Sequence, residues 1–194
     1  MADYTFVGGG GIIYRAPAGT QLPEGTSGKL PTESQITTAG FVEVGEISSD
    51  GLRFTPSKES TDIPNWGGST LRSISSSHTE EFAFSMANFV QTITQKAAFG
   101  DDAVSTTAAT TSHGTITKLE FTDKMDTEAA WLFYMEDGDK MVIAHAARAV
   151  VTGWDEVSFI SSDISKWGMT CKALKDETSG CSVTVLSDDG VVTA

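Results

Sequence analysis

The chain has 194 residues, of which 13 are basic and 26 acidic, and its formal net charge at pH 7 is −13. This charge disfavours direct binding to nucleic-acid phosphates, and no apolar run approaches the roughly 20 residues that a membrane-spanning helix needs. The length suits one domain, and a composition rich in Ser, Thr and Gly favours strands and turns over helices.

Residues 1–40 are expected to form an N-terminal arm. The glycines of residues 8–11 hold no single conformation on their own, and only residues 12–16 have the composition of a short strand. Proline and glycine then recur through residues 17–31, which is typical of an extended loop. Loops of this length usually have a function or become ordered by a partner. The start of the chain has no secretory signal pattern, so we expect synthesis in the cytoplasm.

The next segment is predicted to contain a hairpin followed by a long loop. Strands are expected at residues 41–48 and 52–55, joined by the turn dipeptide Asp50-Gly51. Residues 56–68 are predicted to be a second polar loop. It contains one Ile and one Trp, and such side chains need to be covered by other parts of a structure.

A second strand pair is predicted at residues 71–77 and 81–87. In the latter, Phe82, Phe84 and Met86 alternate with smaller or polar residues, which indicates one buried face.

One helix is predicted near residues 88–99. Asn88 is a suitable N-cap and Gly100 a suitable stop. An apolar stripe at helical spacing supports the helix and consists of Phe89, Val90, Ile93 and Ala97.

Beyond the helix, residues 101–113 are expected to be a Ser/Thr/Ala-rich surface loop, and the rest of the chain mostly strands. The strands are predicted at residues 114–122, 129–136, 140–151, 156–160, 166–174 and 181–186, with Asp137-Gly138-Asp139 as a turn. The predicted fold is therefore mainly β, a β-sandwich or barrel with one flanking helix and a long N-terminal arm and loop. Residues 41–194 are expected to form its single domain.

The sequence contains no motif for catalysis or for a cofactor. The glycine run lacks the Lys-Ser/Thr that ends a phosphate-binding loop, and His78, His113 and His145 have no metal-ligand spacing. Neither Asp137-Gly138-Asp139 nor residues 123–128 follow the alternating pattern of a calcium loop. We therefore expect no enzyme, no cofactor and no metal.

Cys171 and Cys181 flank a predicted turn at residues 175–180. They could lie opposite each other, but two free thiols in a reducing compartment are the favoured interpretation.

Several segments resemble those of a known family. They are residues 14–20 (YRAPAGT), residues 44–52 (VGEISSDGL), residues 63–67 (IPNWG) followed by Leu71-Arg72, and residues 84–88 (FSMAN) with the helix after them. In these segments and in the order of its elements, the sequence resembles the major tail protein, or tail tube subunit, of long-tailed siphovirus-type bacteriophages.

This resemblance implies a structural virion protein with a β-sandwich or barrel fold flanked by a helix. Such proteins close into six-membered rings, and the rings stack into a hollow tube that conducts genomic DNA from capsid to host. The implied partners are other copies of the chain together with tape-measure and tail-end proteins, and the implied location is the virion tail, after synthesis in the host cytoplasm.

Two alternatives come from other classes of protein. An acidic β-sandwich binding module, such as a surface adhesin or capsid decoration protein, would share the composition but would stay monomeric. A small β-barrel hydrolase is disfavoured by the missing motifs.

Two sets of residues are candidates for the assembly. Contacts between subunits are predicted for the segment from Arg53 to Arg72, with Trp66 alternatively capping the core of its own domain; the set is Arg53, Phe54, Ile63, Trp66 and Arg72. Residues 101–160 hold 11 acidic and 4 basic residues, a net charge of −7. An acidic set facing the channel or its rim is predicted to keep DNA from adhering, or alternatively to form a solvated outer face; it comprises Glu43, Glu46, Asp137, Asp139, Asp155 and Glu156.

Overall fold

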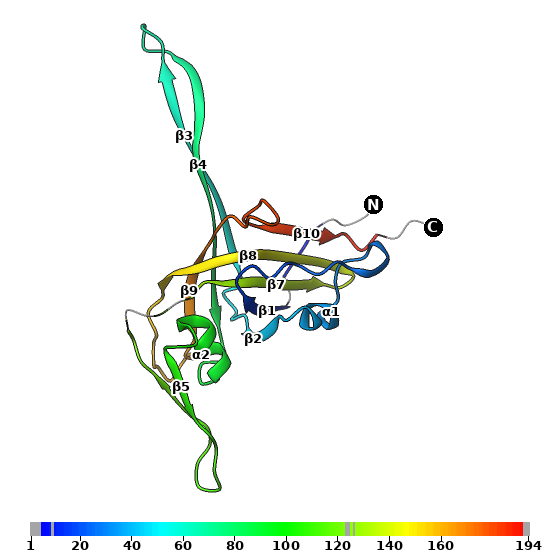
Figure 1. Cartoon of the computed structure of the whole chain (residues 1–194), viewed down its shortest axis with the longest axis vertical. Coiled ribbons are helices and arrows are strands. Elements are labelled where there is room, and N and C mark those ends of the chain that lie inside the picture. The colour runs from blue at the N-terminus through cyan, green and yellow to red at the C-terminus, as the bar shows by residue number, and fades with distance from the viewer. Residues whose placement is uncertain (1–4, 9, 123–124, 126, 192–194) are drawn as a thin grey trace.

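The computed structural model describes residues 5–8, 10–122, 125 and 127–191. Most of the ordered elements are strands of one large antiparallel sheet, in the order β2-β1-β7-β8-β9-β4-β3 with β10 also paired to β8 (Figure 1). The strands are β1 (Gly10–Pro17), β2 (Val42–Glu46), β3 (Arg53–Pro64), β4 (Thr70–Met86), β7 (Ala129–Asp137), β8 (Lys140–Trp154), β9 (Trp167–Ala173) and β10 (Thr184–Asp188). The predicted mainly β fold with one main helix is confirmed, and the sheet is open rather than closed into a barrel.

Strand β8 organises the sheet because it has different neighbours along its length. One edge pairs with β7. The other edge pairs first with β10, from Met141 to His145, and then with β9, from Ala149 to Trp154. The Asp137-Gly138-Asp139 turn between β7 and β8 forms as predicted, with Gly138 in the left-handed region at φ +63°.

The first forty residues contribute more to the sheet than their composition suggests. Strand β1 lies between β2 and β7 and pairs with β7 along its whole length, so it belongs to the sheet and not to an irregular arm. Ile13 and Tyr14 are buried there. A short helix, α1 (Glu33–Thr38), also differs from the expected loop. It begins with a capping box, in which the Gln35 amide donates to Thr32 Oγ1 and the Thr32 amide donates to Gln35 Oε1.

Apolar side chains pack on both faces of the sheet, and β7 shows this directly. Trp131 and Phe133 belong to one buried cluster, whereas Leu132 and Tyr134 belong to the other. Because side chains alternate between the two faces of a strand, a nearly continuous apolar run indicates a strand covered on both sides. The first cluster also contains Phe82, Phe84 and Met86, which confirms the alternation predicted for this segment.

Helix α2 (Thr92–Phe99) is shorter than predicted. It ends at Gly100, with φ +90°, as expected, but its N-cap is Gln91 and not Asn88. The preceding residues are held by other contacts. The Phe89 ring stacks on Trp167 with centroids 4.3 Å apart, and the Phe89 carbonyl accepts hydrogen bonds from Trp167 Nε1 and Gln95 Nε2. Val90 is consequently exposed and is not part of a buried stripe.

The predicted loop at residues 56–68 is wrong, because β3 continues to Pro64. The two short strands predicted at 71–77 and 81–87 are one strand, β4, which pairs with β3. The hairpin predicted around Asp50-Gly51 does not form either. Strand β2 pairs with β1, and the turn in which the Gly51 amide donates to the Ser48 carbonyl leads the chain away to β3.

Further along, part of the predicted loop 101–113 forms β5 (Val104–Thr107), which pairs with β6 (Ile116–Leu119) in a second, two-stranded sheet. The strand predicted at residues 156–160 is wrong, since this segment lies in the connection between β8 and β9. The candidate calcium segment at residues 123–128 lies partly outside the described residues. Cys171 and Cys181 are both free thiols, and burial raises the pKa of Cys171 to about 12.

His145 makes stability dependent on pH. Its ring is buried on β8, edge-on to Phe41, with Nε2 3.1 Å from the Thr20 carbonyl oxygen. Burial lowers its pKa below 6.5, although the Thr20 carbonyl and Asp176 act in the opposite direction. Below pH 6.5 the unfolded chain therefore binds more protons, and the free energy of unfolding decreases as the pH falls.

We expect His145→Gln to flatten this decrease between about pH 7 and pH 5, as measured by urea unfolding at each pH. The exposed His113, replaced in the same way, is the matched control. An unchanged slope for the His145 variant would contradict the assignment.

Candidate assembly surface

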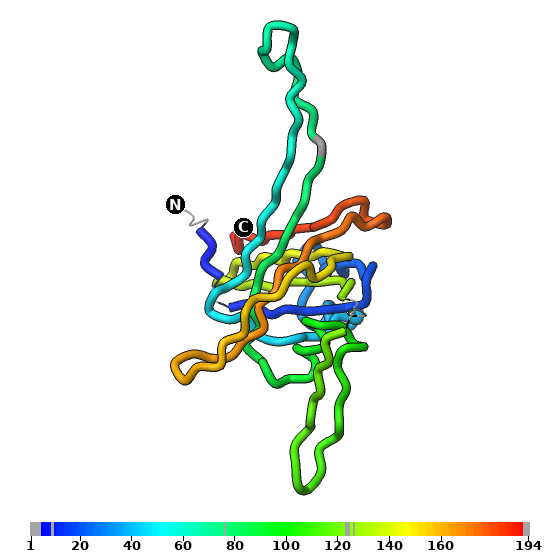
Figure 2. Tube along the Cα trace, turned by 90° about the vertical axis from the view of Figure 1, so that its left-hand side faces the viewer, coloured from blue at the N-terminus to red at the C-terminus, as the bar shows by residue number. Residues whose placement is uncertain are grey.

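The β3–β4 hairpin extends far from the rest of the molecule (Figures 1 and 2). All 12 residues of β3 are exposed, and the pairing with β4 runs from Arg53 opposite Ala83 to Pro64 opposite Thr70. Among the described residues, the hairpin is anchored at its base, where β4 pairs with β9 and Phe54 stacks on the buried Phe82 with centroids 4.9 Å apart. The hairpin is therefore a projection without a hydrophobic core of its own.

Large apolar side chains are exposed along this projection. They are Phe54, Ile63, Trp66, Leu71 and Ile74, and Trp66 at the tip has 107% of its reference accessible surface. Exposed apolar groups gathered on one element indicate a surface that a partner covers. Leu71 and Ile74 are not among the contact residues predicted from the sequence.

The tip has a defined conformation that directs Trp66 outward. The Asn65 amide donates to the Ser69 carbonyl at 2.7 Å, and the Ser69 amide donates to Asn65 Oδ1 at 2.9 Å. Gly68 has φ +83°, a conformation that other residues rarely adopt. The turn is thus closed by its own backbone and by the Asn65 side chain.

The shaft of the hairpin is held by polar contacts between its two strands. Ser57 Oγ and Thr79 Oγ1 are 2.8 Å apart, and Ser77 Oγ donates to Glu59 Oε2 at 3.1 Å. An isolated two-stranded hairpin is at best marginally stable in water. Contacts with another molecule would supply the missing stabilisation.

The five residues predicted from the sequence to contact other subunits all lie on this hairpin. Arg53 and Phe54 are at its base, Ile63 is directly opposite Arg72 in the register, and Trp66 is at the tip. Trp66 does not cap the core of its own domain, because its side chain is fully exposed.

The six predicted acidic residues do not form one cluster. Glu43 and Glu46 are exposed on β2, and Asp137 and Asp139 flank the turn between β7 and β8. Asp155 and Glu156 follow the other end of the long strand β8. The acidic residues therefore lie at three places: on the edge strand β2, at the turn between β7 and β8, and beyond the other end of β8.

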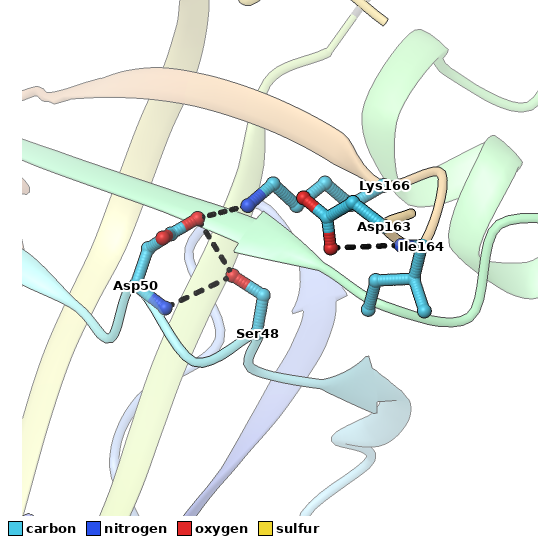
Figure 3. A network of polar contacts seen from close by, with 5 residues as sticks. All are labelled: Ser48, Asp50, Asp163, Ile164 and Lys166. Atoms are coloured by element: carbon cyan, nitrogen blue, oxygen red, sulfur yellow. Dashed lines mark hydrogen bonds and ion pairs between the residues drawn. The ribbon is translucent and has the colours of Figure 1, made fainter. Parts of the chain in front are cut away.

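A polar network holds the turn that precedes β3 against the segment that precedes β9 (Figure 3). Lys166 Nζ donates to Asp50 Oδ2, and Ser48 Oγ donates to the same oxygen at 3.2 Å. The hydrogen bond from Lys166, and then that from Ser48, lowers the pKa of Asp50. Because both charges are solvent-accessible, this ion pair positions the base of the hairpin more than it stabilises the fold.

The neighbouring loop of residues 155–166 exposes further apolar side chains, namely Phe159, Ile160 and Ile164. Asp163 accepts a hydrogen bond from the Ile164 amide at 2.8 Å (Figure 3). In the sequence, the signal for this surface is four apolar residues, these three and Val157, in a polar segment.

Within the described ranges, no group of three or more His, Cys, Asp and Glu side chains is placed to hold a metal ion. No helix in these ranges is long and apolar enough to cross a membrane.

Comparison with known families decides what kind of protein carries this projection. The model of the phage tail tube protein family matches residues 2–194, which is nearly the whole chain. The chain belongs to the phage tail tube protein family. It is thus a structural component of a phage tail, as the resemblance implied.

No curated protein matches the chain. Among solved structures, it is similar to the sheath/tube terminator of an extracellular contractile injection system (PVC) in the extended state. That match has 8% identity and a TM-score of 0.48, and it covers 96% of this chain and 99% of the other. It is also similar to the tube-terminating cap of the anti-feeding prophage, with 11% identity, a TM-score of 0.47 and coverage of 97% and 95%.

Proposed function

We propose that this chain is the tail tube subunit of a long-tailed, siphovirus-type phage, and that its copies close into hexameric rings that stack into a hollow tube. Genomic DNA passes through the tube into the host without being bound specifically. The proposal joins membership of the tail tube family to one structural observation, the long β3–β4 hairpin whose strand β3 is exposed at all 12 positions.

The hairpin supports assembly because a monomer gains little from it. Its strands contact each other and, beyond the base, no other part of the described chain is paired with them. Ordering a residue costs roughly 1–2 kcal/mol of backbone entropy, so contacts of the apolar side chains with neighbouring copies are the natural compensation. Arg53, Phe54, Ile63, Trp66 and Arg72 are the proposed contact residues.

The acidic residues are proposed to face the channel or its rims. Asp137 and Asp139 lie at one end of β8, Asp155 and Glu156 follow its other end, and Glu43 and Glu46 lie on the edge strand β2, which suits separate rims better than one continuous wall. Carboxylates there would repel DNA phosphates and keep the genome from adhering during passage. A solvated outer face that keeps virions soluble is the alternative for any one of these residues.

The remaining parts of the proposal follow from the same role. The chain is made in the host cytoplasm and becomes part of the virion tail. Tape-measure and tail-end proteins are its other partners, and no catalytic step is assigned to it.

Sedimentation velocity combined with negative-stain electron microscopy, over a series of protein concentrations, tests the proposal. We expect six-membered rings at intermediate concentration and tubes of constant diameter at high concentration. A species that stays monomeric throughout would contradict the proposal and favour an acidic β-sandwich binding module, such as an adhesin or a decoration protein.

Assembly should also depend on ionic strength. Six copies carry six times the net charge of −13, so subunits repel one another at low salt. We expect the concentration needed for assembly to fall as NaCl rises from about 10 mM to 150 mM, where the screening length shortens from roughly 30 Å to 8 Å. Light scattering measures this threshold, and a threshold that rises with salt would show that attraction between charges dominates.

A further inference from the structure

An apolar pocket lies at the base of the β3–β4 hairpin. Its volume is about 610 Å³, within the range of roughly 300–1,000 Å³ typical of ligand pockets. Five separate segments of the chain line it, through residues that include Phe6, Ile47, Leu52, Phe54, Met135 and Val185. Phe6, Phe54 and Val185 are partly exposed, so the pocket is open to solvent.

The tip of the same hairpin carries the complementary feature, a fully exposed Trp. We propose that Trp66 of one copy inserts into this pocket of a second copy, displaced along the hairpin, and that this contact joins successive rings. The inference rests on the proposed function and names the partner of the hairpin tip as the pocket of another copy of this chain.

The position of the pocket fits such a displacement. Leu52 and Phe54 line the pocket, and Trp66 follows Phe54 by 12 residues, about 40 Å of extended strand at roughly 3.3 Å per residue. A copy shifted by one hairpin length therefore brings its pocket to the tip of the first copy. The Trp66 side chain, called the knob below, and the pocket lie at different places on one molecule. Such a pair forms a head-to-tail contact, which continues into a filament instead of closing on itself.

Charge complementarity points to the same occupant. The outer part of the hairpin, residues 63–79, holds one basic and no acidic residue, a net charge of +1, whereas the rest of the chain carries −14. Carboxylates adjoin the residues that line the pocket: Glu46 precedes Ile47, and Asp137 Oδ2 accepts a hydrogen bond from the Val7 amide at 2.9 Å. Arg72, opposite Ile63 beside the tip, would meet this acidic border.

The two halves of the contact can be disabled separately. Trp66→Ala removes the knob and leaves the pocket intact, whereas Val185→Asp places a charge in the pocket and leaves the knob intact. Val185→Trp, which fills the pocket with an apolar side chain, provides a second pocket variant. Val90→Ala, at an exposed site outside both features, is the control.

Electron microscopy and sedimentation of each variant, and of an equimolar mixture, test the inference. We expect each knob or pocket variant alone to form single rings and to need at least about 30-fold more protein to stack. The mixture should form pairs of rings that do not grow further, because only one type of contact is complete. The control should form tubes like the unmodified chain.

The outcomes separate this inference from the proposed function. Tubes of normal length from Trp66→Ala, or from both pocket variants, would overturn the docking and leave the ring and tube proposal standing. A mixture that stays as single rings would also overturn it. An unmodified chain that forms neither rings nor tubes would overturn the proposed function and the docking together.

Discussion

Phe133→Ala should lower the free energy of unfolding of the unassembled protein by about 3–5 kcal/mol, the range observed when a buried Phe is truncated. The Phe133 side chain is fully buried on β7. Its ring lies 4.9 Å from that of Phe82 and 5.1 Å from that of Phe84, so it joins β7 to β4 across one face of the sheet. Truncation leaves a cavity that these rings cannot fill without moving.

Urea unfolding of dilute, unassembled protein measures this decrease. Phe159→Ala is the matched control, because Phe159 is mostly exposed and its truncation should cost less than about 1 kcal/mol. A decrease below about 1 kcal/mol for Phe133→Ala would mean that the aromatic cluster on this face does not stabilise the sheet.

Trp66→Ala should weaken assembly and leave the stability of the monomer unchanged. Since the side chain touches no part of the buried core, the unfolding midpoint of the monomer should stay within experimental error. Assembly should weaken by about 2 kcal/mol or more at each interface from which the indole is removed, the size expected of a Trp at the centre of an interface. Trp66→Phe should recover part of this free energy, because it restores an apolar ring.

Melting curves and light scattering on the same samples separate the two effects. A lower melting temperature with unchanged assembly would place Trp66 in the stability of its own domain after all. Unchanged behaviour in both measurements would remove Trp66 from the assembly surface.

Local signals predict the parts of the fold that depend on neighbours in the sequence. The alternation of Phe82, Phe84 and Met86, the helix stop at Gly100 and the Asp137-Gly138-Asp139 turn are all present. The capping box of α1 is a signal of the same kind, because its two side chains, Thr32 and Gln35, are three residues apart.

The β3–β4 hairpin could not be predicted in the same way. Alternation reveals a strand because one face is buried, and a strand exposed at all 12 positions has no such pattern. Pro56 and the many Ser and Thr residues favour a loop instead. The contact residues predicted there nevertheless lie on one element, because an Ile and a Trp in a polar segment already indicate contact with another molecule.

The pairing of β1 with β7 could not be predicted for a different reason. These contacts join residues more than a hundred positions apart, as between Gly10 and Glu136, and no local property specifies which strands become neighbours. The pocket at the base of the hairpin depends on the same long-range arrangement, so it could be recognised only in the folded chain.

A cryo-electron microscopy map of the phage tail is the decisive measurement for the proposed role. We expect a hollow tube whose wall is built of six copies of this chain per ring, with the β3–β4 hairpin of each copy reaching the next ring. A tail wall into which this fold cannot be placed, or density for it only on the capsid surface, would contradict the tail tube assignment.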